Sequence, residues 1–300
     1  MKIFLTGATG LIGQALCQYW LGQEHKLYAW VRDKSSAVKK LGNGVQTYEA
    51  LADIPAGKQF DAIVNLAGTP IAGFPWTGAR REKLYNSRIE TTESLVQWVT
   101  ERGHDHAPKV LISVSAAGYY GRRGDEALSE DEPAQNIFMS RLCADWEKAA
   151  LTMAEHGVRV VIPRLSVVLS KKGGALPQLL LPHKVGLGAV FGKGHNYFPW
   201  VHIDDVVQAM DLFLHNERTS GPYNLVAPEA VTQTTFNKTL ATTLKRPHFI
   251  KIPAPLVRLM MGEMSDLFLA SQNMSAQKIA DVGFKFRYPT LQAALSDLTT

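Results

Sequence analysis

The first half of the chain alternates short apolar runs with longer stretches in which apolar residues recur at helical spacing. Apolar runs rich in β-branched residues predict strands, and the i, i+3, i+4 spacing predicts helices. The predicted strands cover 2–6, 26–31, 45–48, 61–66, 109–114 and 158–163, and the predicted helices cover 11–22, 79–102, 138–156 and 204–215. This alternation predicts an α/β fold with a Rossmann-type doubly wound parallel sheet.

The alternation fades after Leu165. Glycine and proline cluster at 173–199, and the stretch 248–300 is rich in methionine, proline and aromatic residues. We therefore expect a Rossmann domain at 1–164 and a smaller C-terminal α/β substrate (lid) domain made of 165–201 and 228–300, with a helix and a strand at about 202–227 that return to the sheet. Open α/β sheets bind ligands beyond the carboxyl ends of their strands, so the loops after the fourth, fifth and sixth strands are the expected site.

A glycine-rich segment follows the first predicted strand and opens the first predicted helix. Residues 6–13 read Thr-Gly-Ala-Thr-Gly-Leu-Ile-Gly. The first glycine permits a tight turn, the second lets the backbone approach a pyrophosphate, and the third lets the helix pack closely on the strand. Free backbone N–H groups and the helix dipole then receive the phosphates. A glycine turn without a ligand is the alternative. The strand–turn–helix context favours a dinucleotide site, formed by Gly7, Thr9, Gly10, Leu11, Ile12 and Gly13.

Two residues after the second predicted strand bear on the choice of cofactor. A carboxylate at this point holds the ribose hydroxyls of NAD, whereas an arginine pairs with the 2′-phosphate of NADP. Arg32 comes first after the strand and Asp33 comes next. Arginine suits phosphate through planar, multi-donor contact, so the order favours NADP(H) over NAD. The alternative is that Arg32 is an ordinary exposed loop residue.

Composition excludes several classes of protein. The 300 residues are 46% apolar, which suffices for a large core. No apolar run approaches the length of a membrane span, and the beginning of the chain has no signal-peptide pattern. Two lone cysteines, Cys17 and Cys143, indicate a reducing, cytoplasmic setting. The net charge of +5 is spread over scattered pairs, which argues against nucleic-acid binding, and we identify no metal-binding motif.

Several loops resemble those of the extended short-chain dehydrogenase/reductase superfamily. They are residues 65–68 (Asn-Leu-Ala-Gly), Ser115 with 119–121 (Tyr-Tyr-Gly), and 201–205 (Val-His-Ile-Asp-Asp). The segments 262–264, 270–272 and 283–290 resemble the small C-terminal domain of unknown function of one atypical branch, the epimerase family or SDR39U1-like proteins. The resemblance covers essentially the whole chain. It implies a Rossmann fold, a nicotinamide dinucleotide, and cofactor contacts from Leu66, Ala67 and Gly68.

The resemblance also shows where the chain departs from the superfamily. Typical members use a Tyr-x-x-x-Lys pair on the helix after the fifth strand, with a serine upstream. Aligned on Trp146 and Glu147, the tyrosine position falls on Met139 and the lysine position on Cys143. A thioether carries no proton and a thiol is not a cation, so the usual acid–base pair is missing. Cysteine at the lysine position is what this branch implies, as is Arg88 where the superfamily usually has asparagine.

Three candidate catalytic residues remain, each with a structural alternative. Ser115 either faces the cofactor or substrate with its hydroxyl or satisfies a backbone group at the strand end. Tyr120 is either a proton donor or a ring packed beneath the lid. Cys143 is either a nucleophile or a small buried apolar side chain.

Charged residues near the expected site also leave two interpretations each. Arg88 either contacts the nicotinamide ribose or phosphate, or forms a surface ion pair. The arginines at 122–123 either bind a phosphate or carboxylate of the substrate, or are solvated charges. We expect His202 and the acids at 204–205 to be structural, with the second acid capping a helix.

These observations favour an NADP(H)-dependent oxidoreductase, or a nucleoside-diphosphate-sugar epimerase, acting on a small molecule, with an anionic substrate as one option. The predicted lid supports an enzyme, because a lid shields a reaction from water. The missing acid–base pair supports the alternative, a non-catalytic NADP(H)-binding regulatory protein. No apolar stripe in the sequence sets an oligomeric state.

Overall fold

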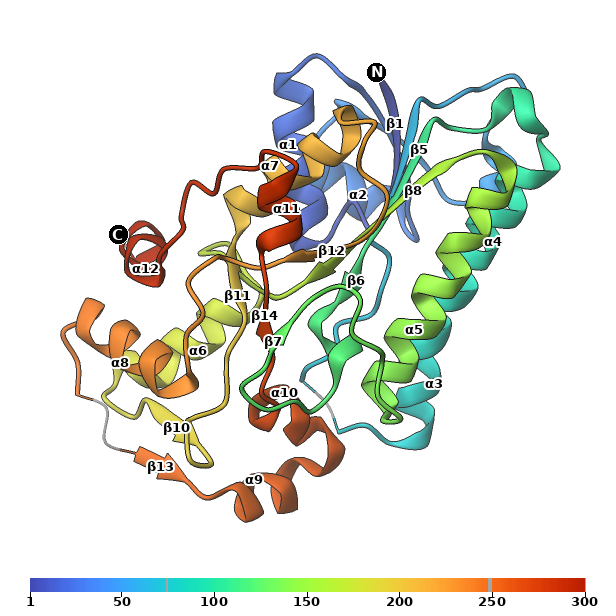
Figure 1. Cartoon of the computed structure of the whole chain (residues 1–300). Coiled ribbons are helices and arrows are strands. Elements are labelled where there is room, and N and C mark those ends of the chain that lie inside the picture. The colour runs from blue at the N-terminus through green and yellow to red at the C-terminus, as the bar shows by residue number, and fades with distance from the viewer. Residues whose placement is uncertain (74, 248–249, 300) are drawn as a thin grey trace.

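A parallel sheet of eight strands forms the centre of the computed structural model, which describes residues 1–73, 75–247 and 250–299 (Figure 1). Residues 248–249 and 300 of the C-terminal stretch considered above therefore lie outside the described residues. Seven strands follow the order β12-β8-β5-β4-β1-β2-β3, and β6 also pairs with β8. Their bounds are β1 (Lys2–Thr6), β2 (Lys26–Trp30), β3 (Val45–Tyr48), β4 (Ala62–Asn65), β5 (Val110–Ser113), β6 (Ser115–Ala116), β8 (Arg159–Leu165) and β12 (Gly221–Leu225).

Helices cover both faces of this sheet (Figure 1). On one face α1 (Leu11–Gly22) packs beside α7 (Ile203–His215), and on the other α4 (Ile89–Glu101) packs beside α5 (Phe138–Leu151). Within β1, Ile3 and Leu5 join the apolar layer under α1 and α7, whereas Phe4 joins the layer under α4. All three side chains are fully buried. Burial on both faces explains why the strands read as nearly continuous apolar runs.

The order of the strands creates a crevice at one edge of the sheet. β1 lies between β2 and β4, so consecutive parts of the chain leave it in opposite directions. The carboxyl ends of β1 and β4, at Thr6 and Asn65, therefore border the point where the connections diverge. Doubly wound sheets bind their ligands at this topological switch point.

The strand predictions are confirmed to within two residues at each end, but the helix predictions need correction. The predicted helix at 79–102 is two helices, α3 (Gly78–Asn86) and α4, separated by a turn at Ser87 and Arg88, where the Arg88 side chain donates to the carbonyls of Leu84 and Thr69. The helix predicted at 138–156 ends as α5 at Leu151 and continues as a 3₁₀ turn. The pattern also missed α2 (Lys34–Leu41), in which few positions are apolar.

Residues beyond β8 build a smaller body with its own core around Trp200 and Phe236. α7 packs beside α1 and β12 pairs with β8 of the large sheet. The domain boundaries, with the returning helix and strand at about 202–227, stay predictions. The strands of the smaller body pair as β9 (Val167–Leu169) with β11 (Trp200–His202) and β10 (Ala189–Phe191) with β13 (Ile250–Ile252), and β14 (Asn273–Met274) pairs with β7 (Ala127–Leu128) from the loop after β5. Its helices are α6 (Ala175–Lys184), α8 (Gln233–Thr243), α9 (Ala254–Met261), α10 (Asp266–Leu269), α11 (Gln277–Asp281) and α12 (Leu291–Thr299).

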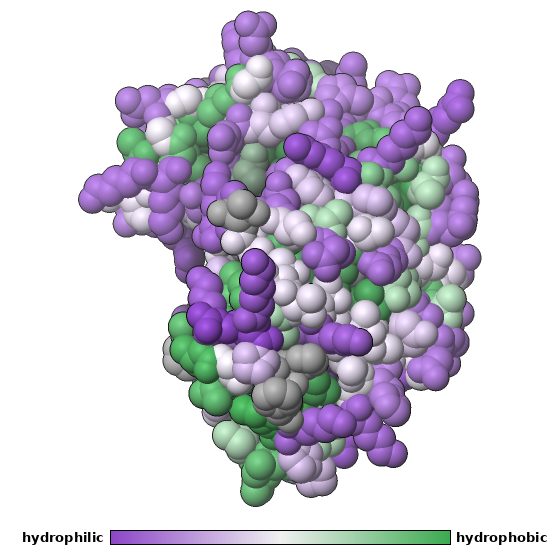
Figure 2. All heavy atoms as spheres, turned by 90° about the vertical axis from the view of Figure 1, so that its left-hand side faces the viewer, coloured by the Kyte–Doolittle hydropathy of each residue, from purple (hydrophilic) through white to green (hydrophobic). Residues whose placement is uncertain are grey.

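The outer end of the smaller body exposes apolar side chains. Leu256, Leu259 and Met260 of α9 are 46%, 82% and 72% exposed. Figure 2 shows green atoms gathered toward the lower end of this face, where α9 and β13 lie in Figure 1. Within the described ranges, no helix combines the length and the apolar character needed to span a membrane.

Candidate active site

The glycine loop between β1 and α1 has a backbone that larger residues do not fit. Gly7 has a φ of +66°, and a Cβ at this position would lie 2.6 Å from the carbonyl oxygen of Leu66. A Cβ at Gly13 would lie 2.4 Å from the carbonyl oxygen of Gly7 and 2.6 Å from the Cα of Ala8. The loop is therefore packed against the loop after β4 and against the start of α1. Both contacts are between backbone atoms, so neither can relax by a side-chain rotation.

The start of α1 is open to an anion. Gly10 is its N-cap, no side chain caps the helix, and its first turn holds no acidic residue. Backbone N–H groups at such an end point outward, and the helix dipole favours negative charge there. Leu11 and Ile12 open the helix, and Thr9 directly precedes its cap. The loop at Gly173 and Gly174 reaches the side chain of Leu11 from the smaller body. The uncapped helix and the tight loop fit a pyrophosphate.

The two residues after β2 have different environments. The Asp33 carboxylate caps α2, accepting hydrogen bonds from the Ser36 amide at 3.1 Å and the Ser35 hydroxyl at 2.8 Å. These hydrogen bonds, the Ser36 amide first, hold the pKa of Asp33 below its usual value. Arg32 is exposed and makes no hydrogen bond or ion pair with any described residue. The carboxylate is thus engaged within the protein, whereas the guanidinium is available.

A buried polar network joins the carboxyl ends of the three central strands. The Asn65 side chain accepts a hydrogen bond from the Thr6 hydroxyl at 2.6 Å and donates to the hydroxyls of Thr92 and Ser113 at 2.8 and 3.0 Å. Thr6 in turn accepts hydrogen bonds from the amides of Leu66 and Ala67. This network fixes the loop after β4 against the glycine loop.

Arg88 lies beside that loop and carries a half-buried positive charge. Its guanidinium donates to the carbonyls of Leu84 at 3.1 Å and Thr69 at 3.0 Å, and a Cβ on Gly68 would lie 3.0 Å from its Cζ. Burial lowers its pKa. Since none of its partners in the described part of the chain is a carboxylate, the surface ion pair considered for Arg88 is not present. The charge faces the site without an acidic partner.

Ser115, Met139 and Cys143 come together behind the loop after β5. A Cβ on Gly118 would lie 2.9 Å from Met139 Cε and 3.5 Å from Cys143 Sγ. The Ser115 hydroxyl is buried, and among the described residues its only hydrogen-bond contact is the weak one with the Cys143 thiol. Burial, with a contribution from the Glu147 carboxylate, raises the pKa of Cys143 to about 12. The thiol is therefore held neutral, which does not suit a nucleophile.

This environment makes thiol reactivity a test of the nucleophile hypothesis. At pH 8 a thiol with a pKa of about 12 is thiolate in only about one molecule in 10,000. Cys17 is also buried, with a pKa raised to about 12 by burial. We expect no reaction of the folded protein with Ellman's reagent at pH 8 and two reactive thiols after unfolding in guanidinium. Rapid labelling of one thiol in the folded protein, mapped to Cys143, would contradict this environment.

Tyr120 belongs to a second buried network. Its hydroxyl donates to Asn224 Oδ1 at 2.6 Å and accepts from Arg164 at 3.0 Å. Arg164 also pairs with both carboxylate oxygens of Glu147 at 2.9 Å. Burial raises the pKa of Tyr120 to about 12 although Arg164 acts in the opposite direction. Tyr120 is held in a structural network, and its high pKa is unfavourable for proton transfer near neutral pH.

The other charged candidates join the smaller body to the sheet. Arg122 forms a bidentate pair with Asp266 on α10 at 2.8 and 2.9 Å, and Arg123 donates to backbone carbonyls of Tyr120 and Pro133. Both arginines are engaged by other groups of the protein, so these contacts match neither of the two interpretations, substrate binding or solvated charge. They fasten the loop after β5 to its surroundings instead.

The group at 202–205 is structural, but the expected cap is wrong. The Nδ1 atom of His202, not Asp205, caps α7 by accepting the amide of Asp204 at 3.0 Å. Asp205 accepts the amides of Arg287 and Tyr288 at 2.6 and 3.1 Å. The sequence prediction failed because the partners of Asp205 come from the end of the chain.

A surface hollow of about 500 Å³ lies elsewhere, along the outer edge strand β3 and the helix α2. Its lining includes Lys34, Val38, Thr47 and Asp53. β2 separates this hollow from β1 and its glycine loop. The candidate site therefore lies at the loops of the switch point and not in this hollow.

The strand order and the loop at its switch point define a Rossmann-type α/β protein. The chain belongs to the NAD dependent epimerase/dehydratase family, whose model matches residues 3–226. Residues 252–298 match a model described as a domain of unknown function, DUF1731. The two matches together agree with the resemblance found in the sequence.

Proteins similar over their whole length support this assignment. An epimerase family protein of Staphylococcus aureus (strain MRSA252) is 34% identical over 302 residues, covering 99% of each chain. The crystal structure of human epimerase family protein SDR39U1 (isoform 2) with NADPH is 32% identical, with a TM-score of 0.89 and 99% of each chain covered. A nucleoside-diphosphate sugar epimerase from Corynebacterium glutamicum is 28% identical with a TM-score of 0.79, and the match covers 99% of this chain but 58% of that one.

Proposed function

We propose that this chain binds NADP(H) along the carboxyl edge of its sheet, with the pyrophosphate between the glycine loop and the start of α1. The geometry that carries the proposal is the pair of backbone contacts at Gly7 and Gly13 beside an uncapped helix. Because the glycines have no Cβ, phosphate oxygens can approach the turn closely. The backbone amides at the start of α1 then donate hydrogen bonds to them. Leu66, Ala67 and Gly68, held by Thr6 and Arg88, would border the rest of the cofactor.

The end of β2 supports NADP(H) in preference to NAD. The carboxylate of Asp33 is engaged as the cap of α2, so it is withdrawn from ribose hydroxyls. The free guanidinium of Arg32 suits a 2′-phosphate, which it can bind through several N–H donors. NADPH is also the ligand named for the human relative.

Replacement of Arg32 by alanine is expected to weaken NADPH binding by about 10- to 100-fold and to leave NADH binding nearly unchanged. The reason is the loss of a charge-assisted contact with the 2′-phosphate, a group that NADH lacks. Calorimetric titration of both cofactors measures the difference. Lys40→Ala, which removes an exposed charge at the far end of α2, is the matched control and should affect neither cofactor. Equal losses for NADPH and NADH in Arg32→Ala would refute the assignment of Arg32.

For the reaction, our proposal is an oxidoreductase or nucleotide-sugar epimerase of unknown substrate. The nicotinamide would supply hydride transfer, and Ser115 offers a hydroxyl in contact with the Cys143 thiol. Arg88, the N-cap of α4, supplies a cation, which in typical members of the superfamily comes from a lysine on the helix after the fifth strand. A nucleoside-diphosphate sugar is the substrate class in the name of the Corynebacterium relative. Both cysteines are buried free thiols, which fits a cytoplasmic protein.

A specific set of contacts favours a second candidate, a non-catalytic NADP(H)-binding regulatory protein. Met139 and the neutral thiol of Cys143 occupy the acid–base position, and Tyr120 is held by Arg164 and Asn224. Mixing the NADPH complex with small carbonyl compounds, and the NADP⁺ complex with nucleotide sugars, distinguishes the candidates. Cofactor oxidation at 340 nm or epimer formation by NMR supports the enzyme, and tight NADPH binding without turnover supports the regulatory protein.

A further inference from the structure

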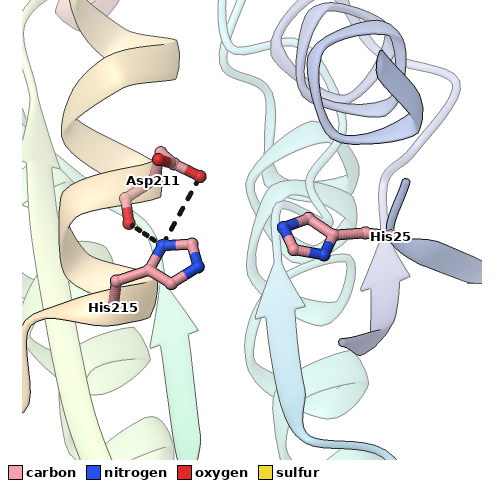
Figure 3. Close-up of side chains that lie close together, drawn as sticks. All are labelled: His25, Asp211 and His215. Atoms are coloured by element: carbon pink, nitrogen blue, oxygen red, sulfur yellow. Dashed lines mark hydrogen bonds and ion pairs between the residues drawn. The ribbon is translucent and has the colours of Figure 1, made fainter. Parts of the chain in front are cut away.

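Three side chains that commonly bind metals meet at the amino ends of the strands. His25 lies in the turn between α1 and β2, and Asp211 and His215 lie one helical turn apart on α7. One ligand atom from each lies within 4.8 Å of the other two. Figure 3 shows the two imidazole rings facing one another across the gap, with Asp211 on the same side of α7 as His215. This cluster lies at the opposite end of β2 from Arg32, so it is separate from the cofactor site.

In each imidazole ring a hydrogen bond engages Nδ1, which leaves Nε2 as the atom that can reach an ion. The Nδ1 atom of His215 donates to the carbonyl oxygen of Asp211 at 2.9 Å, which places the lone pair of the neutral ring on Nε2. The Nδ1 atom of His25 lies 3.0 Å from the amino nitrogen of Met1. When the charged amino group donates to Nδ1, the proton of the neutral ring is on Nε2. An ion therefore binds Nε2 in the other tautomer, in which Nδ1 carries the proton and donates to the neutral amine, and binding releases the proton of the ammonium group. Histidines that bind metals typically have their second nitrogen held by such a hydrogen bond.

The carboxylate is held in a comparable way. Asp211 Oδ1 accepts a hydrogen bond at 2.9 Å from the indole N–H of Trp20, whose side chain is fully buried on α1. The Oδ2 atom keeps its lone pairs for another partner. His215 is 50% exposed and Asp211 25%, so an ion can reach the cluster from solvent and the side chains have room to adjust.

We propose that His25, Asp211 and His215 bind a divalent ion of the zinc class, with water as a fourth ligand. Two imidazole nitrogens and one carboxylate oxygen match the ligands and the coordination number that zinc takes at open sites. A tetrahedral ion would draw the ligand atoms to about 3.3 Å apart, a small closure from the 4.8 Å limit observed. The ion joins the turn before β2 to the end of α7. Its role is to fasten α7 to the N-terminal half of the sheet, independently of the cofactor.

The test uses untagged full-length protein, freed of metal with EDTA and then titrated with ZnCl₂ by calorimetry. We expect one zinc ion per chain. His215→Ala and His25→Ala should each lower the affinity by at least about 100-fold, and Trp20→Phe should lower it by about tenfold, because the indole only orients the carboxylate. His195→Ala removes an exposed histidine of the smaller body and is the matched control, with unchanged binding.

Thermal unfolding separates loss of the site from loss of the fold. Zinc at 100 times its Kd should raise the Tm of the wild-type protein by about 5 °C and leave that of His215→Ala unchanged. In EDTA the two proteins should unfold at similar temperatures. If either alanine variant is unfolded in EDTA, Asp211→Asn takes its place, since it keeps an oxygen for Trp20 and loses the charge. The absence of stoichiometric binding, or equal affinity in wild-type and folded variants, overturns the proposal.

Discussion

Replacing Gly13 with alanine is expected to lower the affinity for NADPH by about 100-fold or more. The new Cβ would lie 2.4 Å from the carbonyl oxygen of Gly7 and 2.6 Å from the Cα of Ala8. No side-chain rotation relieves contacts with backbone atoms, so the loop must move away from α1 by about 1 Å. In catalytic sites a misplacement of about 1 Å costs roughly 100-fold in rate, and we expect a similar loss of cofactor affinity here. The overpacking should also lower the free energy of unfolding by about 1–3 kcal/mol.

Gly22→Ala is the matched control, because the same helix receives the same methyl group. Gly22 ends α1, and no atom lies within 4 Å of the position of its Cβ. Alanine there should raise the free energy of unfolding by up to about 1 kcal/mol and leave NADPH binding unchanged. Calorimetry and thermal unfolding measure both variants. Wild-type affinity in a folded Gly13→Ala protein would show that the cofactor does not lie on this loop.

Replacing Arg164 with methionine is expected to lower the free energy of unfolding by about 3–5 kcal/mol. The side chains of Arg164 and Glu147 are 3% and 8% exposed, so the change leaves a buried carboxylate without its cation. It also removes hydrogen bonds to the Tyr120 hydroxyl and the Glu130 carbonyl. Urea unfolding measures the loss.

Two further variants isolate the cause of this loss. Arg164→Met combined with Glu147→Leu removes both charges and should recover much of the stability, as apolar replacements of buried pairs commonly do. Arg122→Met breaks a bidentate pair with Asp266 in which the arginine is 55% exposed, and it should cost less than about 1 kcal/mol. If Arg122→Met and Arg164→Met lowered the free energy of unfolding by similar amounts, burial of the ion pair would not explain the effect of Arg164→Met.

The large sheet was predictable because its signal is local. Each central strand is buried on both faces, so residues such as Ile3, Phe4 and Leu5 form an apolar run that is read directly from the chain. The break between α3 and α4 was not predictable, because the turn at Ser87 and Arg88 contains no glycine or proline that would mark it. α2 escaped prediction because its start depends on the cap supplied by Asp33, with little apolar periodicity behind it.

The candidate site also has a part that could be predicted from the sequence and a part that could not. The glycine loop is contiguous and was found from spacing alone. The buried network was not, because Tyr120, Glu147, Arg164 and Asn224 come from four elements and form no motif. Arg164, the last residue but one of the largely apolar strand β8, was the available signal, since a buried cation requires a partner.

The return of β12 to the large sheet has a consequence for synthesis of the protein on the ribosome. β12 pairs with β8 in register, Leu225 opposite Leu165, although the first part of the smaller body lies between them in the chain. At about 5–20 residues per second, β8 waits about 3–12 s for this partner after it has been made. During that interval it is an apolar strand with an open edge, the kind of surface on which nascent chains associate wrongly. The order of segments along the chain thus makes the β8 edge a site for chaperone protection.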